Sequence, residues 1–350
     1  MTRLRLAASV LGLAAVLAVG VSASAAARGG ADEPVPLRGV ALTGKTGLRL
    51  LVSDNPPFVL DVDSGNVSRV SGLRAIGRGV HSVVGIAGRS AVVVAHFAGD
   101  AGLYSVRGRG AHATSLGTGR KVVPAAGGRS VWITRVVGRG HCHCALRHVA
   151  LAGRELGGNQ SFPCASTFES AGTLGVVVNR TRVLDPRTGR TVLTTRWGVL
   201  AAAGRKLLLA GPGRRFTLLD AASGAEQAFS WPSIVGGLDR PAVDPRGRYV
   251  ALAFADPAWE GGGTQALDVW VLDVRTGTLA QLPGMPALVA LKATDMAWTD
   301  DGRLVLLGES EGRDVVAVWR PGETRLGVRR VRMPERSGGS DSFAPLGRFG

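Results

Sequence analysis

Residues 243–254 read VDPRGRYVALAF and residues 268–277 read DVWVLDVRTG, and these two stretches decide the fold. In the first stretch, a turn around Gly247 leads into an apolar run. In the second, an apolar run ends at Asp273, and a short turn closes at Gly277. An Asp that opens such a turn and a Gly that closes it are typical of a type I turn between antiparallel strands. The two stretches therefore predict neighbouring antiparallel strands.

Both patterns recur along the chain. The Gly turn followed by an apolar run occurs at 88–94, 128–133, 204–209, 247–252 and 302–307, with a weaker copy at 172–178. The strand whose turn is closed by Gly occurs at 59–65, 183–189, 218–224 and 269–277, with degenerate copies ending at Gly108, Gly153 and Gly322. The closing glycines recur on average every ~43 residues, and a fixed period of this length is the signature of a repeat architecture.

The repeat unit predicts an all-β chain that forms a single β-propeller. The apolar run after each Gly turn is too continuous for a half-exposed strand, so we expect a strand covered on both faces. Four short strands in about 43 residues make one blade, and a blade cannot bury its own faces alone. We expect seven four-stranded blades, with six or eight left open because the first unit is incomplete at its start. Residues 36–40 are a candidate for an outer strand against the last blade.

Residues 243–277 resemble the repeat of TolB-type and WD-like β-propellers, and MAWTDDGRL at 296–304 is similar to the start of the next repeat. The resemblance is strongest over residues 240–320 and implies the fold. The chain leaves no room for the small α/β domain that precedes the propeller in TolB, or for the hydrolase domain that follows it in prolyl oligopeptidases. We expect the propeller over residues 35–333 and a flexible Gly/Ser-rich tail over residues 334–350.

The start of the chain predicts a secretory signal peptide. A short basic segment is followed by the mostly apolar residues 6–21 and the small residues 22–27. An Ala-Ser-Ala cleavage site ends at Ala25, so we expect a signal peptide over residues 1–25 and a linker over residues 26–34. The alternative is an uncleaved membrane anchor. Both readings place the protein outside the cytoplasm, either secreted or in the cell envelope.

The composition excludes several classes of protein. Hydrophobic residues make up 45% of the chain, which is too many for a disordered chain, and the 51 glycines lack the strict triplet of collagen. One apolar run approaches the length of a membrane helix, which excludes a polytopic membrane protein. The net charge is +16, but the basic residues are spread along a chain with 5% aromatic residues. This scatter argues against nucleic-acid binding, which we do not expect, and the excess of Arg over Lys is typical of a GC-rich genome.

Long loops on one face of the predicted ring are the candidates for a binding site. In a four-stranded blade, the connection between the second and third strands shares a face with the connections between blades. The loop at 255–266 holds Asp256, Trp259 and Glu260, an aromatic ring beside carboxylates that suits ligand binding. The alternative is a loop whose Trp packs back on the blade. The Asp that recurs in each strand-end turn indicates turn hydrogen bonding and not catalysis.

The three cysteines lie around the third predicted blade. In an oxidising compartment we expect a disulfide from Cys142 or Cys144 to Cys164, and the pair Cys144–Cys164 is favoured. The alternative is a soft-metal site, since thiolate and imidazole groups bind zinc or copper. Its ligands would be His141, Cys142, His143, Cys144, His148 and Cys164. We expect the disulfide, and no metal or other cofactor.

The sequence favours a monomeric binding module for a protein or a cell-wall polymer, acting through the loop-bearing face. One alternative is an extracytoplasmic lyase or hydrolase with its site at the central funnel, and another is a metal-binding module built on the His-Cys cluster. No catalytic residue is predicted, because neither a Ser-His-Asp arrangement nor a carboxylate pair is visible in the sequence.

Overall fold

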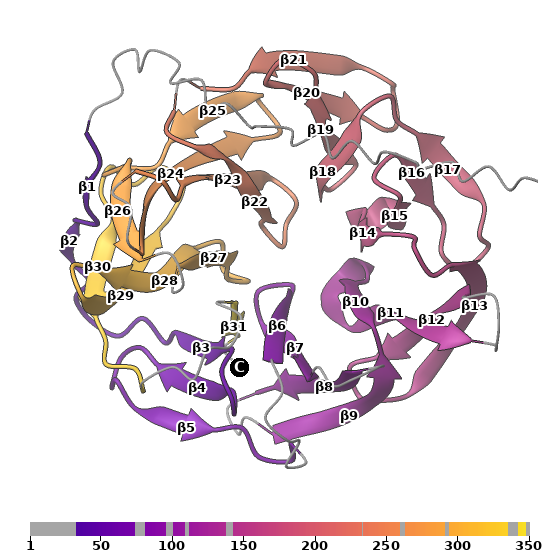
Figure 1. The fold of residues 1–350 in the computed structure, drawn as a ribbon, viewed down its shortest axis with the longest axis horizontal. Helices are drawn as coiled ribbons and strands as arrows, with labels where there is room; N and C mark the ends of the chain where they lie inside the picture. Colours follow the sequence, from indigo (N-terminus) through magenta and orange to yellow (C-terminus); the bar gives the residue numbers. More distant parts are fainter. Residues whose placement is uncertain are drawn as a thin grey trace, which may run out of the picture. The chain divides into compact units, whose positions relative to one another are not determined.

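The structure is a computed structural model that describes residues 33–73, 81–95, 101–108, 112–137, 143–232, 234–259, 263–290, 294–334 and 342–347. The predicted signal peptide and nearly all of the predicted linker lie outside these residues. The strands of the described residues form seven sheets, and neighbouring sheets contact one another around a ring (Figure 1). Two 3-10 turns, η1 (Ala126–Gly128) and η2 (Gly172–Leu174), are the helical elements of this part of the chain. The prediction of an all-β propeller is confirmed.

Five of the seven sheets have four strands. The first sheet contains β31 (Phe343–Leu346), β3 (Arg49–Val52), β4 (Phe58–Asp61) and β5 (Val67–Arg69), and the second contains β6 (His81–Ile86), β7 (Ser90–Ala95), β8 (Ala101–Arg107) and β9 (His112–Gly119). The third contains β10 (Lys121–Pro124), β11 (Ser130–Val137), β12 (His143–Ala150) and β13 (Glu155–Pro163), and the fourth contains β14 (Phe168–Ser170), β15 (Val176–Val178), β16 (Arg182–Leu184) and β17 (Thr191–Thr194). The fifth contains β18 (Gly198–Ala203), β19 (Lys206–Gly211), β20 (Arg215–Asp220) and β21 (Glu226–Ser230).

The last two sheets are larger than the predicted four strands. One contains β22 (Gly237–Val243), β23 (Tyr249–Asp256), β24 (Thr264–Asp273), β25 (Thr278–Gln281), β26 (Ala287–Ala290) and β1 (Val35–Pro36); the other contains β27 (Asp295–Trp298), β28 (Leu304–Ser310), β29 (Arg313–Trp319), β30 (Gly327–Arg330) and β2 (Val40–Ala41). The N-terminal segment therefore adds short parallel strands to two sheets, and β2 lies against the last predicted blade as expected.

The C-terminal segment differs from the predicted flexible tail. Residues 343–346 form β31, which pairs antiparallel with β3, and its four residues are all buried. The last strand of the described residues is thus the inner strand of the first sheet, so the first and last parts of the propeller are joined by β3 and β31. The sequence FAPL is apolar enough to enter the core, and pairing with β3 removes its backbone groups from water. The remaining tail residues, 335–341 and 348–350, lie outside the described residues.

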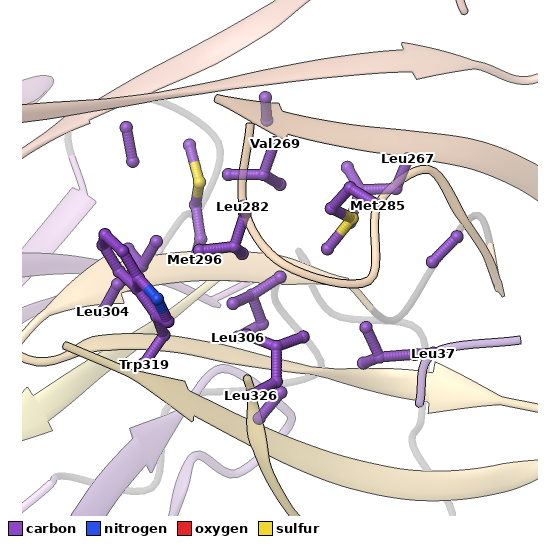
Figure 2. Close-up of a cluster of buried hydrophobic side chains, with 14 of the residues drawn as sticks. Leu37, Leu267, Val269, Leu282, Met285, Met296, Leu304, Leu306, Trp319 and Leu326 are labelled. Atoms are coloured by element: carbon purple, nitrogen blue, oxygen red, sulfur yellow. The ribbon is translucent and has the colours of Figure 1, made fainter. Parts of the chain in front are cut away.

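The apolar runs after the Gly turns form the second strand of each sheet, and both faces of these strands are buried. All six residues of β7 are buried, and the side chains of Leu207, Leu208 and Leu209 in β19 are at most 1% exposed. Figure 2 shows one interface between sheets, where Leu267 and Val269 of β24 face Leu304 and Leu306 of β28 across a cluster of Leu and Met side chains. Each such leucine contributes roughly 1.5–3 kcal/mol by leaving water.

The strand-end turns have the predicted chemistry. The side chain of Asp273 accepts a hydrogen bond from the backbone N–H of Arg275, and its carbonyl accepts one from Gly277 N. The residue after the Asp then donates its N–H to the residue that precedes the second strand, as in Val274 N to Arg248 O at 2.9 Å. The same tie joins Val62 to Leu48, Leu151 to Arg129 and Ala221 to Arg205. We call this contact the turn tie.

An ion pair holds the seam between the last and first sheets. Arg329 of β30 donates to Asp63 Oδ1 at 2.7 Å and to the carbonyl of Leu42 at 2.7 Å. Burial of Asp63 works against ionisation, but the hydrogen bonds from Thr46, Gly47 and Arg329 outweigh it and lower the pKa of Asp63 to about 2.

No helix in the described part of the chain is long and apolar enough to span a membrane.

Candidate functional site

A cleft of about 540 Å³ opens between the sheet β10–β13 and the sheet β14–β17. This volume is in the range of small-molecule sites. Its walls are formed by residues 125–132 and His148 of the first sheet, and by residues 172–175 and 185–192 of the second. These residues belong to the turns between first and second strands and between third and fourth strands. The cleft therefore lies on the face opposite to the loop-bearing face.

The cleft opens where the turn tie is missing. In the sheet β14–β17 the residue after the turn Asp is Pro186, which has no N–H to donate. By the register of β15 and β16, Gly175 lies opposite Asp185, and its carbonyl accepts a hydrogen bond from Ala171 within its own turn. Gly175 has φ of 124°, and a Cβ there would lie 2.1 Å from Leu184 O, so this local path requires glycine. Pro186 has no N–H to donate, so these two turns lack the tie that Val62, Leu151, Ala221 and Val274 make in four of the other described sheets.

An aromatic pair and a hydroxyl form the wall that comes from β11 and β12. Trp132 and His148 are directly opposite in the sheet and stack with ring centroids 4.3 Å apart and planes 13° from parallel. His148 Nε2 and Ser130 Oγ share a hydrogen bond of 2.7 Å. Burial, with a smaller effect from the nearby charge of Arg187, lowers the pKa of His148 below its usual 6.5. The imidazole is therefore neutral at neutral pH.

The opposite wall carries one cation and one carboxylate. Asp185 accepts hydrogen bonds from Arg187 N at 2.9 Å and Thr188 Oγ1 at 3.0 Å, and the backbone bond from Arg187 is the main reason why the pKa of Asp185 is lowered. Both oxygens of the Asp185 carboxylate therefore stabilise the turn by accepting hydrogen bonds within it. The Arg187 side chain is exposed, while its carbonyl accepts a hydrogen bond from Gln160 of β13 at 3.4 Å. The cleft therefore offers a positive charge, a hydroxyl, an imidazole and an apolar wall.

The predicted loop site lies elsewhere. Asp256 ends β23, and its side chain accepts a hydrogen bond from Ala258 N at 3.0 Å. Trp259 follows in the same turn and is half-buried. Its backbone N–H donates a hydrogen bond to the Asp256 carbonyl. The loop is shorter than predicted, because residues 255–256 and 264–266 belong to strands. Glu260 lies outside the described residues.

Cys164 is disulfide-bonded, but not to Cys144, which was the favoured partner. The Sγ atoms of Cys144 and Cys164 are 3.0 Å apart, which is hydrogen-bond distance and longer than an S–S bond of about 2.05 Å. The Cys144–Cys164 disulfide is therefore not formed in this structure. Cys142 and His141 lie outside the described residues. Cys144 is buried within β12, and Cys164 directly follows the outer strand β13.

The structure separates the residues of the alternative metal site. His143 and Cys144 are neighbours in β12, so their side chains point to opposite faces of the sheet. His148 is four residues further along the same strand, roughly 13 Å from Cys144, so the two cannot hold one metal ion. Among the described residues no group of three or more His, Cys, Asp or Glu side chains is placed to bind a metal. His148 faces the cleft instead.

Comparison with solved structures decides the fold family. No family model and no curated protein matches the chain by sequence. An acylaminoacyl peptidase in complex with Z-Gly-Gly-Phe-chloromethyl ketone aligns with a TM-score of 0.53 and 10% identity, over 85% of this chain and 53% of the peptidase. A functionally unknown protein from Desulfotomaculum acetoxidans aligns with a TM-score of 0.51 and 12% identity, over 86% of this chain and 99% of its own. The chain is a β-propeller.

At such identities the likeness shows the fold alone. TolB from Acinetobacter baumannii is also among the matches, with a TM-score of 0.47 and 12% identity over 88% of this chain and 68% of TolB. The propeller fold that the resemblance to TolB-type and WD-like repeats implies is confirmed by the ring of sheets. The propeller spans about half of the acylaminoacyl peptidase chain.

Sequence reasoning missed the cleft of this propeller, although one signal was available. The copies of the strand-end turn have Val62, Ala221 and Val274 after the Asp, whereas the fourth sheet has Pro186. A residue without an N–H in a repeated hydrogen-bonding position marks a turn that packs differently. His148 was grouped with the cysteines by nearness in sequence, but its place in β12 puts it at the other end of the sheet.

Proposed function

We propose that the chain is an extracytoplasmic propeller of seven blades that binds a protein or a cell-wall polymer through its loop-bearing face. The seven sheets support the blade number. The predicted signal peptide supports the compartment, and the charge of +16 suits the acidic polymers of a cell wall.

The hairpin β23–β24 is the observation that carries this proposal. β24 has ten residues, and its two halves pair with different strands. Trp270–Asp273 pair with β25, as in an ordinary blade, whereas Thr264–Leu267 pair with β26, which itself pairs with β1. The far end of the hairpin is thus supported by two additional strands. A braced hairpin presents a binding residue at a lower entropic cost than an isolated loop.

Trp259 is the residue that this hairpin presents. It lies in the turn that follows β23, and the Asp256 side chain fixes that turn through Ala258 N. Tryptophan is enriched among the residues that dominate protein interfaces, because a large rigid ring leaves water at a small entropic cost. We therefore expect Trp259 to make the main contact with the partner.

Cosedimentation with isolated cell-envelope fragments tests the binding role. The purified chain should sediment with the fragments, and Trp259→Ala should weaken this binding about tenfold, since such a hot spot is worth roughly 1–2 kcal/mol or more. Trp197→Ala is the matched control, because Trp197 is a half-buried tryptophan in the connection β17–β18 on the same face. Protease treatment of the fragments should abolish binding to a protein partner, and cell-wall hydrolase should abolish binding to a polymer. Equal binding by both variants, or none by the parent chain, would contradict the proposal.

Secretion has its own test. Expressed with its N-terminus in a bacterial host, the chain should be exported and should begin after Ala25 by mass spectrometry of the intact protein. A cytoplasmic chain that retains residues 1–25 would contradict the extracytoplasmic assignment while leaving the binding test unaffected.

A further inference from the structure

The cleft between the sheets β10–β13 and β14–β17 has no part in the proposed function, because it lies on the opposite face from the hairpin β23–β24. Its side chains come from two sheets and are held by contacts that do not depend on a partner. Gln160 of β13 holds the Arg187 carbonyl, and the Ser130 hydroxyl is fixed on His148. The cavity is therefore a built feature of the ring and not a gap between mobile loops.

The formal charges of the residues that line the cleft balance, and Arg187 is the more exposed of the two charged residues. Arg187 is the cation among its lining residues, and Asp185 is the carboxylate. Both oxygens of Asp185 accept hydrogen bonds within their own turn, so the carboxylate competes little for the guanidinium. A guanidinium next to a partly enclosed, half-apolar cavity favours a carboxylate, sulfonate or phosphate group, which it binds through charge-assisted hydrogen bonds.

The remaining lining is suited to the body of an organic molecule. Trp132, Leu174 and Val192 line the same cleft as Arg187, together with small alanine and glycine residues. Val192 is 52% exposed, which is a large exposed fraction for a valine that lines a cavity. Covering it with an apolar ligand would remove that surface from water.

We propose that this cleft binds a small organic anion, with the acidic group at Arg187 and an aromatic or aliphatic body against Trp132, Leu174 and Val192. The Ser130 hydroxyl and the His148 imidazole provide a second polar contact at the inner end of the cleft. This inference goes beyond the proposed function and does not depend on it, since the two sites lie on opposite faces.

A pair of fluorescent dyes tests the proposal. The anionic dye 8-anilinonaphthalene-1-sulfonate and the neutral dye N-phenyl-1-naphthylamine share an aromatic body and differ in the sulfonate. Titrated into the full chain under native conditions, the anionic dye should bind at one site at least tenfold more tightly than the neutral dye. Equal affinities, or no binding of the anionic dye, would overturn the proposal.

Two variants assign that binding to the cleft. Arg187→Gln should weaken the anionic dye about tenfold and leave the neutral dye unchanged, because it removes a charged hydrogen bond worth roughly 1.4 kcal/mol. Arg275→Gln is the matched control: Arg275 occupies the same place in the turn after β24, where Val274 makes the turn tie. Val192→Trp should fill the cleft and weaken both dyes. An anionic dye that binds as tightly to Arg187→Gln or to Val192→Trp as to the parent chain would sit elsewhere, and the proposal would fail.

Discussion

The two junctions on either side of the sheet β10–β13 are built from the same repeat, yet one is closed and the other is open. At the junction with β6–β9, the Ser105 hydroxyl donates to the Leu151 carbonyl at 2.5 Å, and the Leu151 side chain is 2% exposed. At the junction with β14–β17, His148 takes the place of Ser105 and bonds Ser130 within its own sheet, while Pro186 takes the place of Leu151. A cleft of about 540 Å³ results.

The two junctions differ at two positions of the repeat: the residue that follows the third strand and the side chain of that strand that faces the neighbouring sheet. At the closed junction, the residue that follows the third strand supplies both an N–H for the turn tie and an apolar side chain for the interface. Leu151 supplies both, and it packs in a cluster with Ile86 and Val92 of the preceding sheet. Pro186 supplies no N–H, so the turns of its sheet part and polar side chains line the gap.

The largest expected effect breaks the closed junction. Leu151→Ala should lower the free energy of unfolding by about 2–5 kcal/mol, because it removes a buried side chain and leaves a cavity. Pro186→Ala, at the matching position of the open junction, should cost about 1 kcal/mol or less, since no sealed interface depends on it. Urea denaturation of both variants measures the two values. Similar losses for the two variants would mean that the junctions do not differ in the way described.

A smaller effect is expected at the seam between the last and first sheets, which is closed by charge. Asp63→Asn should cost about 1–2 kcal/mol at pH 7, allowing for screening at this partly exposed site. The folded pKa of Asp63 is about 2, below the usual 3.8, so its contribution is complete above pH 3.8 and is lost as the pH falls through about 2. The gap in unfolding free energy between parent and variant should therefore narrow below pH 4.

Asp220→Asn is the control for the seam, because Asp220 is a turn carboxylate of another sheet that is bonded by backbone N–H groups of its own turn, without an arginine from another sheet. It should change stability less than Asp63→Asn. A gap between parent and Asp63→Asn that stays constant from pH 7 to pH 3 would show that ionisation of Asp63 does not hold the seam.

The smallest effect concerns the charge of the open junction. Because the pKa of His148 lies below 6.5, its imidazole gains a proton only in acid, where a second positive charge joins Arg187. Asp185 stays ionised over this range, since its pKa is lowered, so it does not reverse the trend. The affinity for the anionic dye should rise several-fold between pH 7.5 and 5, and His148→Phe, which keeps the ring stacked on Trp132, should remove this rise. A pH-independent affinity in the parent chain would show that protonation of His148 does not contribute to binding of the dye over this pH range.

The fold could be predicted because its signals are local and repeated. Gly247 and Asp273 fix turns by their own backbone chemistry, and the adjoining apolar runs fix the buried strands. The inner strand β31 could not be predicted, because its sequence FAPL follows a Gly/Ser-rich stretch and its partner β3 lies almost 300 residues earlier in the chain. Proline at its third position is also a poor strand former, which made a tail the natural expectation.

The candidate site could be predicted less well, because it depends on how two sheets meet. The loop at Asp256 and Trp259 is visible in the sequence as an interruption of the repeat. The cleft arises from Pro186 in one sheet and His148 in the next, nearly 40 residues apart, and each residue is ordinary alone. A search for departures from the repeat at fixed positions would have found Pro186, but not the partner that it faces.

A crystal structure of the chain with 8-anilinonaphthalene-1-sulfonate would show whether the open junction binds an organic anion through Arg187. We expect density for the dye between β10–β13 and β14–β17, with a sulfonate oxygen within hydrogen-bond distance of the Arg187 guanidinium and the rings against Leu174 and Val192. A dye bound at another site with this cleft closed or empty, or one whose sulfonate points away from Arg187 into solvent, would contradict it.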